Sequence, residues 1–134
     1  MIIYLDTSAA LRAVVEAGAS PEIEERIAAA EAILSSRLAI VEAARVFHRL
    51  RLEAKLSGQH LDELERAVEE LWSRSEIWEL SKTICTAAAK VAPSIRLRTL
   101  DALHLATFQT ARRRIVGLEL VTADERLRLA AETL

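Results

Sequence analysis

Four carboxylates occupy positions in this 134-residue chain that are unusual for a surface acid. Asp6 ends the apolar run IIYL, and Asp124 follows a second apolar run, LELVT. Asp101 and Glu42 lie on or beside the apolar face of segments with helical periodicity. Burying an unpaired carboxylate costs several kcal/mol, so each acid needs a partner cation, a metal ion or a proton.

Each acid also has a simpler explanation. Asp6, Thr7 and Ser8 are all good helix N-caps for a helix expected over residues 9–16. Arg45, three residues after Glu42, is an available partner for that carboxylate. Four separate explanations are then needed, whereas one divalent cation accounts for all four acids if they converge.

A converging set of carboxylates has a specific chemistry. Mg²⁺ and Mn²⁺ are held by a few carboxylates and waters, and such sites activate water and stabilise a phosphoryl transition state. The residues therefore predict a metal site with Asp6 as a ligand. Thr7 or Ser8 then either caps the following helix or orients that ligand.

Convergence requires a fold that brings distant segments together. The run IIYL is typical of a strand buried on both faces in a parallel sheet. The chain shows no hairpin signal such as Asn-Gly. The pattern predicts one domain over residues 1–134, an α/β fold of three layers (α/β/α) with a small parallel sheet flanked by helices. Further strands are expected at 32–36, 76–80 and 118–122, and further helices at 21–30, 37–55, 61–73, 82–91, 99–114 and 124–134.

Composition bears more on the compartment of this protein than on its partners. The formal net charge of −2 gives no overall basic field of the kind found in many nucleic-acid binders. The single cysteine, Cys85, cannot form an internal disulfide and is expected to be a small buried hydrophobe. No apolar run approaches the roughly 18 residues of a membrane span, and no signal-peptide pattern opens the chain, so we expect a cytoplasmic protein.

The histidines and tryptophans are expected to have structural roles rather than catalytic ones. His104 follows Asp101 by three residues, but no second histidine or cysteine lies nearby to complete a zinc site. We expect His104 to pack in its helix or to form a hydrogen bond near the acids. His48 is expected at the surface or a dimer contact, and Trp72 and Trp78 in the core or an interface.

Two other classes of function, phosphoryl transfer and binding without cutting, fit the acids less well. A haloacid-dehalogenase-like phosphatase needs a second acid two residues after the first, where this chain has Ser8. A response receiver needs a lysine after a late strand, and this chain has no lysine after its last predicted strand. Glycine-rich phosphate loops are absent as well. A module that binds RNA or protein without cutting has no reason to bear the repulsion of four clustered acids.

Four sequence blocks resemble those of PIN domains, specifically VapC-type toxins of toxin–antitoxin pairs. The blocks are YLDTSAAL, SSRLAIVEAAR, LRTLDALHLATF and LVTADERL, in the expected order over nearly the whole chain. The resemblance implies a PIN-like fold and a Mg²⁺- or Mn²⁺-dependent endoribonuclease. It places the acidic quartet at Asp6, Glu42, Asp101 and Asp124, with Ser8 and Thr122 as polar neighbours that support the metal site.

The resemblance also implies partners. VapC-type proteins are usually homodimers inhibited by a VapB-like antitoxin, and their substrate is RNA. Apolar helices bearing Phe47, Leu50, Leu71 and Trp72 exceed what a small sheet can cover, which favours the homodimer. One departure is the final AAETL, where many relatives continue into another short strand, so the sheet edge is expected to be truncated or closed differently. The alternatives are a PIN nuclease of RNA processing and a PIN-like module that does not cut. The RNA target is open among transfer, ribosomal and messenger RNA.

Overall fold

A four-stranded parallel sheet forms the centre of the computed structural model, which describes residues 1–134. The strand order is β3-β2-β1-β4, and every neighbouring pair is parallel. Because all strands run the same way, their carboxyl ends meet at one edge of the sheet. The strands are β1 (Ile2–Leu5), β2 (Ala32–Ser36), β3 (Ser75–Trp78) and β4 (Glu119–Val121).

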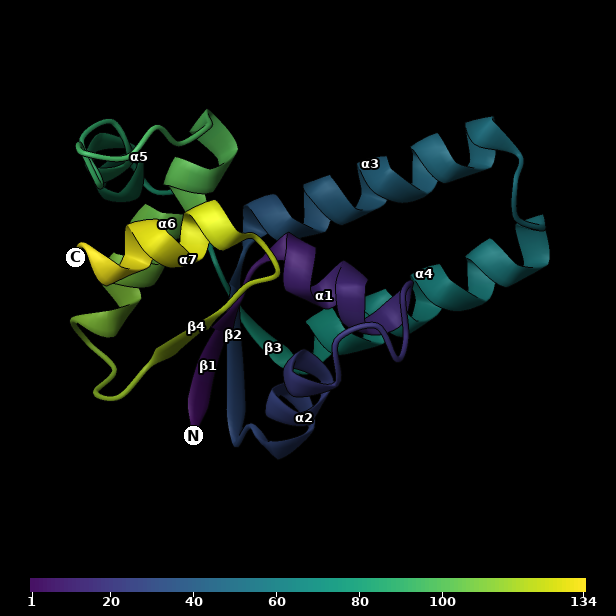
Figure 1. Cartoon of the computed structure of the whole chain (residues 1–134). Helices are drawn as coiled ribbons and strands as arrows, with labels where there is room; N and C mark the ends of the chain where they lie inside the picture. The colour runs from purple at the N-terminus through teal and green to yellow at the C-terminus, as the bar shows by residue number, and fades with distance from the viewer.

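Seven helices cover the two faces of this sheet. In Figure 1, α1, α2 and α4 lie to one side of the strands, and α5, α6 and α7 lie to the other; α3 begins at the carboxyl edge and extends outward beside α4. The expected three-layer α/β/α fold is therefore confirmed. The helices are α1 (Thr7–Val14), α2 (Pro21–Ala29), α3 (Arg37–Glu53), α4 (Gly58–Ser73), α5 (Lys82–Ala88), α6 (Thr99–Arg112) and α7 (Glu125–Glu132).

Alternation along β1 builds two hydrophobic cores. Ile3 and Leu5 belong to a cluster with residues of α1, α3 and α4, whereas Tyr4 belongs to a second cluster with residues of α6 and α7. All three side chains are fully buried. Burial of each large apolar side chain contributes about 1.5–3 kcal/mol, so β1 is clamped from both sides and holds the residue that follows it.

Two helix starts differ from the sequence prediction because of their caps. α1 begins at Thr7 rather than near residue 9, since the Asp6 side chain accepts a hydrogen bond from the Ala9 N–H. α4 begins at Gly58 rather than Leu61, since the Ser57 side chain accepts from the His60 N–H. Hydroxyl and carboxylate side chains satisfy otherwise free N–H groups, which extends each helix toward its cap.

Two expectations about burial are wrong. Cys85 is exposed, because α5 is a short outer helix whose only buried residue is Ile84. Phe47, Leu71 and Trp72 are buried within the chain itself, because α3 and α4 pack against each other and against the sheet. These residues therefore give no reason to expect a dimer. None of the helices combines the length and the apolar character that crossing a membrane requires.

Candidate functional site

Asp6 lies directly after β1, at the carboxyl edge of the sheet, and only 3% of the residue is exposed. Its carboxylate accepts hydrogen bonds from the Ala9 N–H at 2.9 Å and from the Thr122 hydroxyl at 2.6 Å. The Ser8 hydroxyl lies 2.9 Å from each carboxylate oxygen. Asp6, rather than Thr7 or Ser8, caps the helix, and Ser8 contacts the carboxylate as an orienting group.

The environment of Asp6 disfavours its charge. Burial raises the pKa of the Asp6 carboxyl above its usual value, and this effect exceeds the opposing hydrogen bonds from Thr122 and Ala9. No Lys or Arg side chain forms an ion pair with this carboxylate. A cation placed beside Asp6 would therefore relieve an electrostatic cost that the hydrogen bonds of the fold offset only in part.

Ser8 and Thr122 also join the loop after β4 to the start of α1. The Thr122 hydroxyl accepts the Asp124 N–H at 3.0 Å, and the Ser8 hydroxyl accepts the Ala123 N–H at 3.0 Å. Asp124 caps α7, since its carboxylate accepts the Leu127 N–H at 3.0 Å. These bonds place Asp124 beside the segment that carries Asp6.

Glu42 projects from α3 toward α1 and α6. Its Oε1 accepts a hydrogen bond from the Thr7 hydroxyl at 2.6 Å and lies 2.6 Å from His104 Nε2. Burial raises the pKa of the Glu42 carboxyl, but the hydrogen bonds from His104 and Thr7 outweigh it, so the pKa is lowered overall. Glu42 pairs with His104 and forms no ion pair with Arg45, the alternative partner that the sequence offered.

Asp101 lies in the first turn of α6 and shares an arginine with Asp124. Arg98 Nε lies 3.3 Å from the Asp101 carboxylate, and Arg98 Nη2 lies 3.8 Å from that of Asp124. The Arg98 side chain is 80% exposed. With Arg126, these residues line a polar cavity of about 360 Å³.

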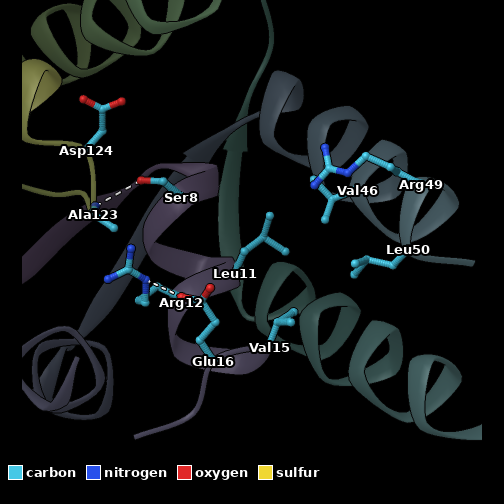
Figure 2. Close-up of a pocket in the computed structure, with 10 residues that line it drawn as sticks. All are labelled: Ser8, Leu11, Arg12, Val15, Glu16, Val46, Arg49, Leu50, Ala123 and Asp124. Atoms are coloured by element: carbon cyan, nitrogen blue, oxygen red, sulfur yellow. Dashed lines mark hydrogen bonds and ion pairs between the residues drawn. The ribbon is translucent and has the colours of Figure 1, made fainter. Parts of the chain in front are cut away.

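A second cavity, of about 350 Å³, adjoins the acids between α1 and α3. Figure 2 shows Asp124 and Ser8 at one end of it, and apolar side chains of α1 and α3 facing one another at the other end. Arg12, Glu16 and Arg49 line the groove as well, so it leads from the acids onto a surface of mixed polarity. Its apolar lining residues are Leu11, Val15, Val46, Leu50 and Ala123.

The structure brings the four predicted acids to the carboxyl edge as two pairs rather than as one compact cluster. Asp101 and Asp124 are joined through Arg98. Asp6 and Glu42 are joined through the start of α1, where Thr7, the residue after Asp6, donates to Glu42. No three His, Cys, Asp or Glu side chains lie close enough together to hold a metal ion. Asp101 and Asp124 line one cavity and Glu42 lines another. The expectation that all four carboxylates line one cleft therefore stays a prediction.

The available donors nevertheless suit a particular kind of ion. Apart from His104 and the guanidinium groups of Arg98 and Arg126, the polar side chains near the four acids carry carboxylate and hydroxyl oxygens. Hard cations such as Mg²⁺ and Mn²⁺ prefer these oxygens. Both ring nitrogens of His104 are already engaged, by Tyr4 and Glu42. His104 therefore forms the expected hydrogen bond near the acids and offers no free nitrogen to zinc.

Sequence reasoning missed three contributors to this site. Tyr4 appeared only as a strand residue, and its hydroxyl lies 2.8 Å from His104 Nδ1. Thr7 was considered a cap, and its hydroxyl binds Glu42 instead. Arg98 had no role in the sequence prediction, and its spacing of three residues from Asp101 was the available signal.

A family model now fits these observations. The model of the PIN domain matches residues 3–132, and the chain belongs to the PIN domain family. Ribonuclease VapC35 of Mycobacterium tuberculosis is 44% identical to it over 68 residues, which cover 51% of this chain and 50% of that protein. The chain thus matches about half the length of this curated relative.

Solved structures share the fold at low sequence identity. VapC20 of Mycobacterium tuberculosis, described as a sarcin-ricin loop cleaving toxin, is 13% identical with a TM-score of 0.69, covering 96% of this chain and 94% of that one. VapBC2 of Rickettsia felis, solved on a DNA fragment from its promoter, is 16% identical with a TM-score of 0.60, covering 92% and 100%. At these identities the similarity establishes the fold alone.

Proposed function

We propose that this chain is a Mg²⁺- or Mn²⁺-dependent endoribonuclease of the VapC toxin type. The observation that carries the proposal is the gathering of Asp6, Glu42, Asp101 and Asp124 at the carboxyl edge of a PIN domain sheet. The similarity to a protein named as a ribonuclease, VapC35, and to VapC20 supports RNA as the substrate. Burial of Asp6 without a cation partner supports a bound metal ion.

Four residues would hold the ion, in part through water, since no three of them lie close enough together to bind it directly. We assign Asp6 and Asp101 as its chief ligands, with Glu42 and Asp124 completing the site directly or through water. A bound divalent cation supplies an activated water and offsets the charge on the scissile phosphate. Ser8 and Thr122 orient the Asp6 carboxylate through their hydroxyls.

Arg98 has two roles in this scheme. Without a metal ion its guanidinium offsets the repulsion between Asp101 and Asp124. Because the side chain is largely exposed, it can leave the acids when a cation binds. Arg98 and the nearby Arg126 are then positioned to contact phosphate oxygens of RNA, a geometry that guanidinium groups suit.

A VapB-like antitoxin and a second copy of the chain are the proposed protein partners. The similarity to VapBC2 supports the first. For the second, Val41, Leu52 and Leu100 are large apolar side chains that remain exposed and line one surface hollow near Glu42. Light scattering at micromolar concentration in moderate salt is expected to give a dimer mass, and a monomer mass would contradict the homodimer.

Cleavage of RNA with Mg²⁺ or Mn²⁺, with and without EDTA, tests the proposed activity. We expect EDTA to abolish cleavage and Asp6→Asn to reduce it by about 100-fold or more, because the ion loses a charged ligand. Since burial disfavours the Asp6 charge, the metal-free variant is expected to stay folded and to melt at a higher temperature.

Asp62→Asn is the matched control, because Asp62 is the only aspartate outside the proposed site and forms an exposed ion pair with Arg51. This variant is expected to cleave RNA at the wild-type rate. Undiminished cleavage in EDTA, or by folded Asp6→Asn protein, would overturn the proposal. RNA binding without cleavage by the wild type would favour a PIN-like module that does not cut.

A further inference from the structure

We propose that His104 is a positioning residue that fixes the Glu42 carboxylate so that one of its oxygens is presented to the metal ion. The inference rests on the proposed function, since it takes Glu42 as part of the metal site. His104 comes from α6 and Glu42 from α3, 62 residues earlier in the chain. His104 is 2% exposed, so its ring is held by the surrounding core.

The direction of the His104 hydrogen bonds follows from the chemistry of their partners. An ionised carboxylate only accepts, so the Nε2 atom, 2.6 Å from Glu42 Oε1, carries the proton. In a neutral ring the other nitrogen, Nδ1, is then an acceptor, and the Tyr4 hydroxyl donates to it at 2.8 Å. Tyr4 thereby holds His104 in the tautomer that donates to Glu42.

The two oxygens of Glu42 are treated differently. The Thr7 hydroxyl and His104 Nε2 both bind Oε1, and Oε2 forms no hydrogen bond within the chain. The Glu42 side chain is 23% exposed, so Oε2 remains reachable from solvent. The two hydrogen bonds to Oε1 fix the Glu42 rotamer before any cation binds. The side chain therefore loses less conformational entropy on binding than a free glutamate would.

Two other roles for His104 do not fit the geometry. A zinc ligand needs a free ring nitrogen, and both nitrogens are engaged. A general base has to reach substrate, whereas this ring is enclosed between Tyr4, Thr7 and Glu42. The remaining alternative is a contact that only stabilises the fold, and the experiment below separates it from positioning.

The test measures Mn²⁺ affinity by titration calorimetry on the whole chain, without RNA. We expect His104→Leu to lower the affinity by about 10-fold, in the range typical for loss of a group that orients a metal ligand. His104→Gln retains an N–H donor that can reach Glu42 and is expected to recover most of the loss. Equal losses in two variants of equal thermal stability would show that only packing matters and would overturn the proposal.

A double-mutant cycle shows whether His104 acts through Glu42. In a Glu42→Ala background, His104→Leu is expected to change Mn²⁺ affinity by less than about twofold, because the positioned group is gone. A further 10-fold loss in that background would overturn the proposal. If His104→Leu does not fold, Thr7→Val removes the other donor to Oε1 and is expected to lower the affinity in the same direction; unchanged affinity would then count against it.

The same titration tests the metal site itself. Wild-type protein is expected to bind Mn²⁺, and Asp6→Asn to bind it much more weakly. If Asp6→Asn binds as well as the wild type, the metal site is wrong and both proposals fall. If Asp6→Asn is impaired and His104→Leu is not, only the positioning role falls.

Discussion

The two pairs of acids at the sheet edge are held in opposite ways. Asp6 and Glu42 accept short hydrogen bonds from hydroxyls and from a buried histidine, which lie in α1, α6 and the loop after β4. Asp101 and Asp124 instead share Arg98, whose side chain is 80% exposed. The first pair is therefore oriented by the fold. The second pair is held by the exposed guanidinium of Arg98, which another cation can replace.

This difference suggests that the two pairs of acids have different roles in metal binding. Groups fixed by the core need no rearrangement when a metal ion arrives, which is the condition for preorganised binding. A pair held by an exposed guanidinium loses little when that ion pair opens, since exposed pairs contribute about 0–1 kcal/mol. We therefore expect changes at the first pair to affect stability strongly and changes at the second to affect mainly the competition between cations.

Thr122→Val tests the connection between the two pairs and has the largest expected effect on stability. The Thr122 hydroxyl donates to Asp6 and accepts the Asp124 N–H, so valine leaves both groups without that partner. We expect the free energy of unfolding to fall by about 1–3 kcal/mol, measured by urea denaturation of the metal-free protein.

Thr110→Val is the control for this change, because Thr110 donates only to the Ala106 carbonyl of its own helix. That variant is expected to lose less than about 1 kcal/mol. Equal losses in the two variants would show that Thr122 does not join the pairs.

Variants at Asp124 distinguish its role as a helix cap from the role of its charge. Its carboxylate accepts the Leu127 N–H at the start of α7. Asp124→Ala is expected to lower the free energy of unfolding by about 1 kcal/mol, and Asp124→Asn to lower it much less, because asparagine is an equally good cap. Both are expected to impair RNA cleavage, and urea denaturation combined with the cleavage assay distinguishes the two roles. Full activity of Asp124→Asn would remove Asp124 from the metal site.

Arg98→Gln has the smallest expected effect on stability and addresses the second pair directly. Because the guanidinium is exposed, the free energy of unfolding of the metal-free protein is expected to change by no more than about 0.5 kcal/mol. Mn²⁺ affinity is expected to rise by about two- to fivefold, since the ion no longer displaces a resident cation. Calorimetric titration that gives weaker binding would show that Arg98 supports the metal site instead of competing with it.

Local patterns in the sequence were enough to predict the layers and the candidate acids. The apolar run before Asp6 predicted a doubly buried strand, and β1 is buried on both faces. The absence of hairpin signals predicted parallel strands, and all pairs are parallel. These features depend on residues close together in the chain, where backbone periodicity and turn chemistry dominate. The assignment of the four acids as metal ligands stays a prediction.

Only the tertiary structure decided which groups each acid contacts. Glu42 had Arg45 as a neighbour on its own helix, but the fold brings His104 from 62 residues away to the same oxygen. Phe47 and Trp72 are covered because α3 and α4 pack together, and no pattern within either helix states what lies opposite it. Hydrogen bonds and burial depend on distances across elements, and a sequence records only the order of residues along one chain.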